Sequence, residues 1–347
     1  MKLSDFDFHL PQELIAQTPS PQRGGSRLLV LDRSSHTIKH AAFSDLPHYL
    51  TDHPVMVFND TRVLPAKLEG TLENQGRAIE ILLVKEECPG TWQVLMKDLK
   101  KFKPGQRLIF GEGNLEAEFV ERQNDMGLIR FSANPDLENQ LETFGKMPLP
   151  HYIHRPLGDG ADTDPLDRER YQTIFAKQPG AIAAPTAGLH FTNEMLGQLS
   201  ECAEPVYLTL HIGPGTFQPV RVEEIEHHQM KAEYYQIPAD TWNTLRQAKD
   251  QDRKIMAVGT TVTRVLESVD FQREEKCDVS GWTDRFIYPG QTFRNTDHLL
   301  TNFHLPQSTL YMLTCAFAGP SYLKQAYEEA IQAQYQFFSY GDAMLIL

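Results

Sequence analysis

The segment between residues 66 and 132 constrains the fold most strongly, because short apolar stretches alternate there with turn signals. Those turn signals are Glu73-Asn74, Pro89-Gly90, Pro104-Gly105, Gly113-Asn114 and Asn124-Asp125. Short strands at this spacing are typical of a small antiparallel barrel or sandwich. We expect strands at Lys67–Leu72, Ala78–Val84, Trp92–Met96, Arg107–Phe110, Leu115–Glu121 and Leu128–Phe131, followed by a helix over Asp136–Phe144.

The flanking sequence has a different character, in which strand patterns alternate with helical ones. Strands are expected at Arg27–Leu31, Val55–Phe58, Ala181–Ala184, Pro205–Leu210, Lys254–Val258, Arg285–Ile287 and Leu299–Asn302. Helices are expected at Asn193–Leu199, Thr241–Lys249, Val262–Val269 and Tyr322–Tyr335. This order indicates an α/β domain. We therefore predict a mixed α/β fold, in which residues 1–64 and 149–347 form a discontinuous α/β catalytic domain and residues 65–148 form an inserted β-barrel domain.

The composition indicates an ordinary soluble protein. Hydrophobic residues make up 41% and charged residues 23% of the 347 positions. No apolar run approaches the roughly 20 residues of a membrane span, and the N-terminal sequence lacks the features of a signal peptide. The 4 cysteines form no CxxC pair, which argues against a disulfide framework or a cysteine-rich metal site. We expect a cytoplasmic protein with no membrane partner.

The net charge of −13 argues against a general nucleic-acid binder, because such proteins usually carry a basic surface. A local basic patch remains compatible with this charge. Its densest candidate is residues 97–103, with the sequence KDLKKFK, which is equally well read as a solvated hairpin loop.

Five loops rich in glycine, histidine and threonine follow residue 181. They read APTAGLHFT from Ala184, LTLHIGPGTF from Leu208, AVGTTVTR from Ala257, TNFHLPQST from Thr301 and FFSYGDAM from Phe337. Loops held at strand ends by a rigid scaffold often carry the chemistry of a protein. The five loops therefore predict one composite pocket, although they contain no phosphate-binding loop, zinc helix or nucleophile elbow.

Three histidines lie in these loops, namely His190, His211 and His304. Such residues can bind a metal, transfer protons or serve as hydrogen-bonded structural groups, and for each one alone the structural role is the commoner. Asp60, Glu233 and Asp342 are candidate acids, although Asp60 and Asp342 also suit turn caps and Glu233 suits a surface position. Two arginines, Arg62 and Arg264, can hold a phosphate or carboxylate, or pair with neighbouring acids. Tyr340 and Phe338 can stack on a base or pack in the core.

At these residues the chain resembles the S-adenosylmethionine:tRNA ribosyltransferase-isomerases of queuosine biosynthesis, over essentially its full length. The stretches that carry the resemblance are DFDFHLPQELIAQTP, NDTRVLPAKL, RERYQTIFA, APTAGLHFT, LTLHIGPGTFQPV, AVGTTVTRVLE, FIYPG, TNFHLPQSTL and FFSYGDAMLI. Two positions depart from the family pattern. Lys231 stands where the family usually has histidine, which puts in doubt an essential histidine there, and Gln291 stands where tyrosine is usual.

The resemblance implies an α/β domain interrupted by a six-stranded barrel. It also implies that S-adenosylmethionine donates a ribosyl group to 7-aminomethyl-7-deazaguanine at the tRNA wobble position, giving epoxyqueuosine-tRNA, adenine and methionine. The implied partners are the anticodon arm of tRNA and S-adenosylmethionine. We expect no further cofactor, no metal and a monomer.

Such a reaction needs proton-transfer groups in a shielded pocket. We assign proton transfer to His190 and His211, and compensation of the sulfonium charge to Glu233 or Asp342. For substrate binding we expect hydroxyl, glycine, arginine and other polar positions in the same loops and in the NDTR segment at residues 59–62. They are Asp60, Arg62, Thr186, Gly188, Thr209, Gly213, Gly215, Thr216, Gly259, Thr260, Thr261, Arg264, Asn302, His304 and Tyr340. Two rival functions are a histidine-metal hydrolase acting on a nucleoside, and a non-catalytic RNA-binding module built on the barrel.

Overall fold

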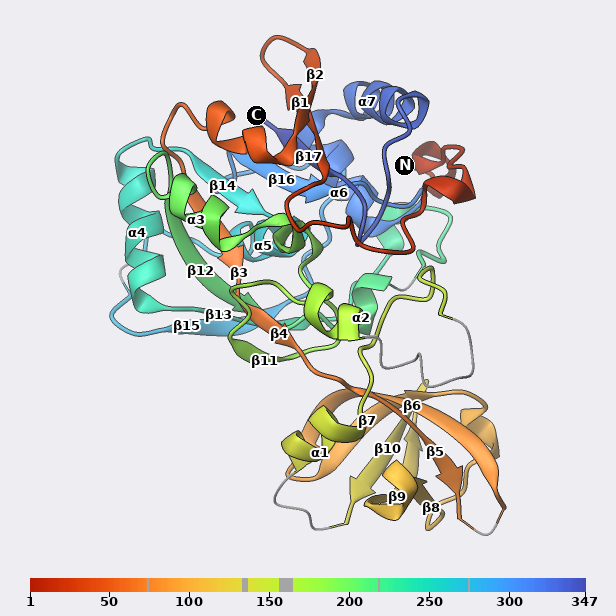
Figure 1. The fold of residues 1–347 in the computed structure, drawn as a ribbon. Coiled ribbons are helices and arrows are strands. Elements are labelled where there is room, and N and C mark those ends of the chain that lie inside the picture. The colour runs from red at the N-terminus through yellow and green to blue at the C-terminus, as the bar shows by residue number, and fades with distance from the viewer. Residues whose placement is uncertain (74, 133–136, 156–164, 218, 274) are drawn as a thin grey trace.

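The computed structural model describes residues 1–73, 75–132, 137–155, 165–217, 219–273 and 275–347. Figure 1 shows a part built around a large sheet, which carries both labelled chain ends, and a barrel that lies apart from it. The chain enters the barrel through β4, Thr61–Val63, which pairs with β11, Gln178–Ala181, in a separate two-stranded sheet. A mixed α/β fold with an inserted barrel is confirmed.

The large sheet has nine strands in the order β15-β13-β12-β3-β14-β16-β17-β1-β2. Its four adjacent strands β12, β3, β14 and β16 are parallel, whereas β13, β15, β17 and β2 include antiparallel pairings. The bounds are β1 Arg27–Asp32, β2 Thr37–Ala42, β3 Val55–Asn59, β12 Glu204–Leu210, β13 Glu233–Ile237, β14 Ile255–Val258, β15 Val279–Thr283, β16 His298–Asn302 and β17 Ala343–Ile346.

Side chains along each central strand alternate between the two faces of this sheet. Val55 and Val57 pack with the helices α4 to α7, whereas Met56 and Phe58 pack with α3 and the turn at residues 43–49. Both faces are therefore covered, which explains why β3 is buried at all five positions. The helices are α1 Leu137–Phe144, α2 Pro165–Arg170, α3 Asn193–Leu199, α4 Ala239–Asp250, α5 Thr260–Leu266, α6 Thr309–Ala318 and α7 Pro320–Gln332.

The barrel closes in the order β10-β7-β6-β5-β8-β9. All six expected strands are present, as β5 Lys67–Leu72, β6 Arg77–Cys88, β7 Thr91–Met96, β8 Arg107–Phe110, β9 Leu115–Gln123 and β10 Met126–Phe131. Inward-facing residues such as Leu68, Ile81, Leu108 and Phe119 fill its interior. The domain boundaries at residues 64–65 and 148–149 stay a prediction. The expected start of the following helix at Asp136 lies outside the described residues.

Three expected elements of the α/β part are displaced. The strand expected at Ala181–Ala184 ends at Ala181, where its partner β4 ends. No strand forms at Arg285–Ile287, because the chain pairs with β13 earlier, through β15. The helix expected over Val262–Val269 is α5, which begins directly after Gly259 and ends at Leu266.

The four parallel strands end at one edge of the sheet, which is where open α/β sheets bind ligands. The residues that follow these strand ends are Asp60, His211, Gly259 and Phe303. Four of the loops singled out in the sequence thus begin at, or pack against, this edge.

Candidate functional site

Two cavities lie beside this edge of the sheet. The first, which we call the inner cavity, has a volume of about 290 Å³. Its lining includes six of the predicted site residues, Thr186, Gly259, Thr260, Thr261, Asn302 and His304. The described lining has hydroxyl, amide, imidazole and aromatic groups but no carboxylate or basic amine. Such a surface suits the hydroxyl and ring groups of a nucleoside-like ligand.

Aromatic rings form part of the inner cavity. Tyr152 and Phe338 both line it, and their ring centroids are 4.2 Å apart. The Tyr152 hydroxyl is hydrogen-bonded to the Ser339 hydroxyl at 2.6 Å, and burial raises the pKa of Tyr152. The tyrosine therefore stays neutral. Aromatic rings that line a cavity can attract a cation.

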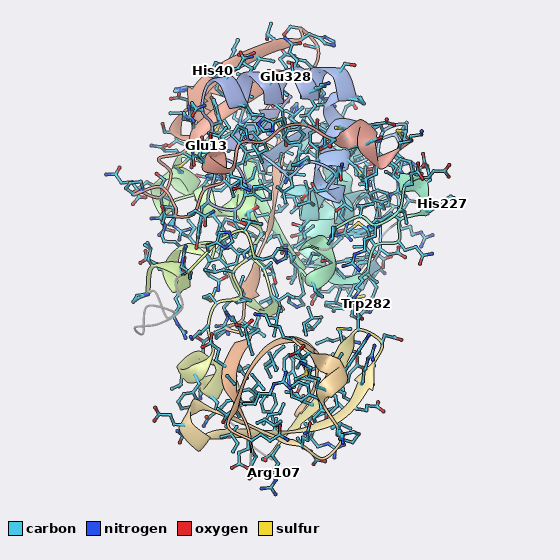
Figure 2. The ribbon with its side chains drawn as sticks, turned by 90° about the vertical axis from the view of Figure 1, so that its right-hand side faces the viewer. Glu13, His40, Arg107, His227, Trp282 and Glu328 are labelled. Carbon is cyan, nitrogen blue, oxygen red and sulfur yellow. The ribbon has the colours of Figure 1, made fainter. Side chains whose placement is uncertain are left out.

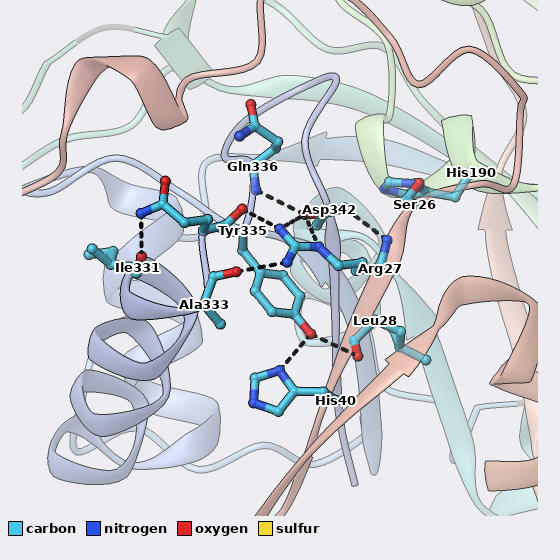
Figure 3. Close-up of polar contacts among 11 residues, drawn as sticks. Ser26, Arg27, Leu28, His40, His190, Ile331, Ala333, Tyr335, Gln336 and Asp342 are labelled. Atoms are coloured by element: carbon cyan, nitrogen blue, oxygen red, sulfur yellow. Dashed lines mark hydrogen bonds and ion pairs between the residues drawn. The ribbon is translucent and has the colours of Figure 1, made fainter.

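His190 lies behind the inner cavity and does not line it. The Asn302 amide nitrogen contacts the Phe338 carbonyl oxygen at 2.9 Å and His190 Nε2 at 3.2 Å. Because that amide can only donate, Nε2 accepts, and Nδ1 carries the proton that reaches Ser26 Oγ at 2.6 Å. Figure 3 shows His190 beside Ser26. Both ring nitrogens thus have partners, and burial lowers the pKa of His190 to about 4. These contacts suit a residue that positions Asn302.

His304 lines the inner cavity as a neutral ring. Its Nε2 is 2.9 Å from the Thr301 hydroxyl, and its backbone N–H donates to the Tyr327 hydroxyl at 3.0 Å. Burial lowers the pKa of His304 to about 3. The residue can therefore accept or donate a hydrogen bond to a ligand, but it carries no charge at neutral pH.

These two histidines should make the protein less stable in mild acid. Their folded-state pKa values of about 4 and about 3 lie below the ordinary 6.5, so the unfolded chain binds protons first. The free energy of unfolding should fall as the pH drops from about 6.5 toward 4, by up to about 1.4 kcal/mol per pH unit for each histidine. Urea unfolding of wild type and His190→Gln at pH 7, 6 and 5 checks this. An equal pH dependence for both proteins would contradict it.

The second cavity, which we call the interdomain cleft, has a volume of about 1100 Å³. One wall comes from β6, β7, β10 and α1, and the other from the segments around β12 and β13. Its lining includes four of the predicted site residues, His211, Gly213, Gly215 and Glu233. Ile212 lines both cavities, so they share one wall directly after the end of β12.

His211 is the predicted histidine that lines the interdomain cleft. Its Nδ1 is 2.8 Å from the Thr61 hydroxyl, while Nε2 has no partner among the described residues. A Cβ on Gly180 would lie 2.8 Å from the imidazole, so glycine leaves room for the ring. Half-burial lowers the pKa of His211, which keeps the ring neutral. The arrangement offers an oriented imidazole nitrogen for proton transfer.

Glu233 and Arg264 form a buried ion pair beside His211. Glu233 Oε2 is bonded to Arg264 Nη1, and its Oε1 accepts the backbone N–H of Gly213 at 2.9 Å. The exposed fractions of the two side chains are 3% and 2%. The pair fixes the loop after His211. The sequence left two roles open for Arg264, namely holding a phosphate or carboxylate of a ligand and pairing with a neighbouring acid. The structure has the second.

Asp342 has a supporting role of the kind expected for a turn cap. Its carboxylate accepts the backbone N–H groups of Arg27 and Gln336 at 2.8 Å each, and it also pairs with the Arg27 guanidinium. Figure 3 shows this cluster, in which Arg27 also lies over the Tyr335 ring. Asp342 lines neither the inner cavity nor the interdomain cleft.

Asp60 and Arg62 also lie outside both cavities. Asp60 is buried and accepts the Thr209 hydroxyl at 2.6 Å, and burial raises the pKa of its carboxyl. Arg62 pairs with Glu138 and Glu142 on α1 at 2.7 and 2.9 Å. Their contacts link the end of β3 and β4 to neighbouring elements.

The remaining predicted positions are structural or undescribed. The Tyr340 hydroxyl donates to Asp167 at 2.7 Å, and its ring packs against Tyr171. Gly188 has no room for a Cβ, which would meet Phe175 and Thr173 at 2.8 Å. The side chain of Thr216 lies outside the described residues.

The two departures from the family pattern occupy different surroundings. Lys231 lines the interdomain cleft, where its amine is 3.4 Å from the Asp125 carboxylate. Gln291 lies in neither cavity, and its amide donates to the Phe286 carbonyl oxygen at 3.3 Å. Position 231 therefore adds a cation to the cleft.

Several cavity residues had no signal in the sequence. Tyr152 lies between α1 and α2, and Trp282, Tyr234 and Arg130 lie on strands β15, β13 and β10, where the sequence did not single them out. Exposed aromatic and basic side chains on strands become informative only when the pairing of those strands is known.

Neither a metal centre nor a membrane span is found in the described part of the chain. Those residues contain no group of three or more histidine, cysteine, aspartate or glutamate side chains arranged to hold a metal ion. Of the helices formed by them, none is long and apolar enough to cross a bilayer.

The comparisons with known proteins agree over the whole chain. A family model described as "Queuosine biosynthesis protein" matches residues 3–346. Curated relatives from Staphylococcus haemolyticus (strain JCSC1435) and Halothermothrix orenii are 46% and 45% identical, with 100% of each chain covered. Both relatives are named S-adenosylmethionine:tRNA ribosyltransferase-isomerase.

A solved structure supports the same assignment. The crystal structure of S-adenosylmethionine tRNA ribosyltransferase from Thermotoga maritima is 34% identical, with a TM-score of 0.55. The alignment covers 99% of this chain and 100% of that one. The sequence, the fold and these relatives lead to one conclusion: the chain belongs to the queuosine biosynthesis protein family and is a transferase.

Proposed function

We propose that this enzyme transfers and isomerises the ribosyl unit of S-adenosylmethionine onto 7-aminomethyl-7-deazaguanine at the wobble position of tRNA. The products are epoxyqueuosine-tRNA, adenine and methionine. The relatives' names support S-adenosylmethionine and tRNA as substrates. The observation that carries the proposal is that two adjoining cavities share Ile212 as a wall, next to a histidine with an unpartnered nitrogen.

The inner cavity is the site we propose for S-adenosylmethionine. Thr186, Thr260 and Thr261 can bond ribose hydroxyls, and Asn302 and His304 can bond the purine. Glu233 and Asp342 already have cationic partners, so the sulfonium must be stabilised in another way. We assign that role to the ring faces of Tyr152 and Phe338, because aromatic faces attract cations.

The interdomain cleft is the site we propose for the acceptor base. His211 lies where the cleft meets the shared wall, and its neutral ring can accept a proton at Nε2. The sulfonium acidifies the adjacent C5′ hydrogens, and the acceptor amine must be uncharged when it attacks. One oriented base at the wall between donor and acceptor serves either proton transfer.

A direct assay tests this function. Purified protein is incubated with S-adenosylmethionine and tRNA that carries the aminomethyl base. Adenine and methionine should appear in equal amounts, and the tRNA should gain the ribosyl-derived mass. Release of S-adenosylhomocysteine instead would indicate methyl transfer and would contradict the proposal.

The same assay, after dialysis against a chelator, tests the part of the proposal that concerns metals and cofactors. We propose that the enzyme is cytoplasmic and monomeric, acts on the anticodon arm, and needs no metal and no cofactor beyond the co-substrate. Turnover should therefore persist after dialysis against a chelator. Stoichiometric metal in the purified protein, with activity lost on its removal, would favour the rival metal-dependent mechanism.

A further inference from the structure

Three rings form a continuous row across the sheet wall of the interdomain cleft. His211, Tyr234 and Trp282 belong to neighbouring strand segments, and Tyr234 lies opposite Trp282 in the β13–β15 register. The His211 backbone N–H donates to the Tyr234 carbonyl oxygen at 3.0 Å. Ring centroids are 6.0 Å apart between His211 and Tyr234, and 5.6 Å apart between Tyr234 and Trp282. The row therefore leads from the cleft mouth to the unpartnered imidazole nitrogen.

Trp282 is unusually exposed for a residue of its size. Its exposed fraction is 57%, whereas among the described residues the other exposed large hydrophobic side chains are Met1 and Leu166. Figure 2 shows Trp282 at the side of the α/β part that faces the barrel. A large exposed apolar ring at the mouth of a cavity is typical of a binding surface.

Basic side chains surround this row in a protein whose net charge is −13. The Lys85 amine of β6 lies 5.4 Å from the Trp282 ring, and Lys231 lines the same cleft. Arg130 of β10 also lines the cleft, is exposed and has no ion-pair partner among the described residues. Of the acids in the lining, Glu138 pairs with Arg62 and Glu233 with Arg264. Lys85 and Lys231 pair with the exposed carboxylates of Glu87 and Asp125 at the rim, and Glu86 accepts the backbone N–H of Gly90. Arg130 is therefore the cation of this lining that can reach a phosphate without giving up a carboxylate partner.

We propose that the interdomain cleft binds a single-stranded segment of the RNA substrate, with the extruded base in the cleft and a neighbouring base stacked on Trp282. This inference rests on the proposed function, because the occupant is the anticodon loop of the tRNA. The faces of rings stack on bases of any sequence, and basic side chains at the rim hold the phosphates. Lys85 and Arg130 reach the cleft from the barrel, so barrel and sheet bind the RNA together.

The first test measures steady-state kinetics of Trp282→Ala and Trp282→Phe with an anticodon stem-loop RNA that carries the aminomethyl base. In Trp282→Ala the KM for RNA should rise about 5- to 150-fold, which is the range expected for one lost stacking contact. The KM for S-adenosylmethionine should stay unchanged, and Trp282→Phe should restore most of the RNA affinity. Because Trp282 is exposed, its removal leaves the core packing intact. An unchanged KM for RNA in Trp282→Ala would overturn the inference.

The second test uses a matched pair of arginines on the barrel. Arg130→Gln should raise the KM for RNA and reduce the salt dependence of binding by about one phosphate contact. Arg107→Gln is the control, because Arg107 is also exposed but lies at the end of the barrel away from the sheet, as Figure 2 shows. Equal effects of the two substitutions would contradict specific binding in the cleft.

Intrinsic fluorescence provides a readout that does not depend on turnover. The stem-loop RNA should quench the fluorescence of wild type more strongly than that of Trp282→Phe, because stacking on an indole quenches it. Equal quenching in both proteins would overturn the placement of the base on Trp282. If wild type binds RNA with this quenching difference but releases no adenine, the proposed function fails while the RNA site stands.

Discussion

Replacing His211 with alanine should lower kcat about 10²–10⁴-fold, the range expected for loss of a general acid or base. The affinities for S-adenosylmethionine and RNA should change only a few-fold, because the ring contributes one face of a large cleft. In wild type the activity should fall as the pH drops through the apparent pKa of His211, which burial places below its usual value. Activity assays with titration of both substrates between pH 5 and 8 check these expectations.

Two control variants separate proton transfer from simple packing. Thr61→Val removes the hydroxyl that orients Nδ1 at 2.8 Å, and we expect a loss of about tenfold, as for one hydrogen bond. His40→Ala removes an exposed histidine that bonds Glu329 and Tyr335 far from both cavities, and we expect wild-type turnover. Near-wild-type kcat in His211→Ala would refute the role assigned to this residue.

Replacing Glu233 with alanine should destabilise the folded protein by about 3–5 kcal/mol, because it leaves the Arg264 guanidinium charged and unpaired in the interior. The backbone N–H of Gly213 also loses its acceptor, so the loop after His211 should lose order and kcat should fall as well. Urea unfolding monitored by circular dichroism gives the free energy, and adenine release gives kcat.

A double variant distinguishes the stability lost because a buried charge has no partner from the stability lost because buried side-chain volume is missing. Glu233→Leu combined with Arg264→Met removes both charges and keeps most of the buried volume, so it should recover much of the lost stability. Catalytic activity should stay low, because the Gly213 amide still has no acceptor. If Glu233→Ala unfolds at the same urea concentration as wild type, the ion pair is not a stabilising element of this loop.

The barrel strands could be predicted because their pattern is local. Each pairs with a strand nearby in the sequence or across a turn, and alternation with turn residues marks the strand ends. In the α/β part, the sequence analysis did not predict β17, which is buried at all four positions. A short, continuous apolar run shows no alternation of apolar and polar residues, so periodicity cannot identify it as a strand. Its pairing with β1 joins residues 28 and 343, which no local signal reports.

The candidate site was predictable as a set of loops but not as a set of roles. Thr186, Thr260 and His304 do meet in one cavity, because the carboxyl ends of parallel strands lie at one edge. His190 belongs to the same kind of loop, yet its ring points to Ser26 and Asn302. Side-chain direction at a strand end depends on tertiary contacts, so residue type and spacing could not separate His190 from His211.

The number of residues that separate paired strands in the sequence also sets the order in which the two parts can fold. The barrel joins strands between Lys67 and Phe131, so it can close as soon as that stretch has left the ribosome. The large sheet is incomplete until β17 inserts between β16 and β1, and translation produces that strand long after the barrel. During synthesis, a finished barrel should therefore be tethered to an open sheet whose β1 and β16 edges are unpaired. Chaperone binding to nascent chains should concentrate on those two edges.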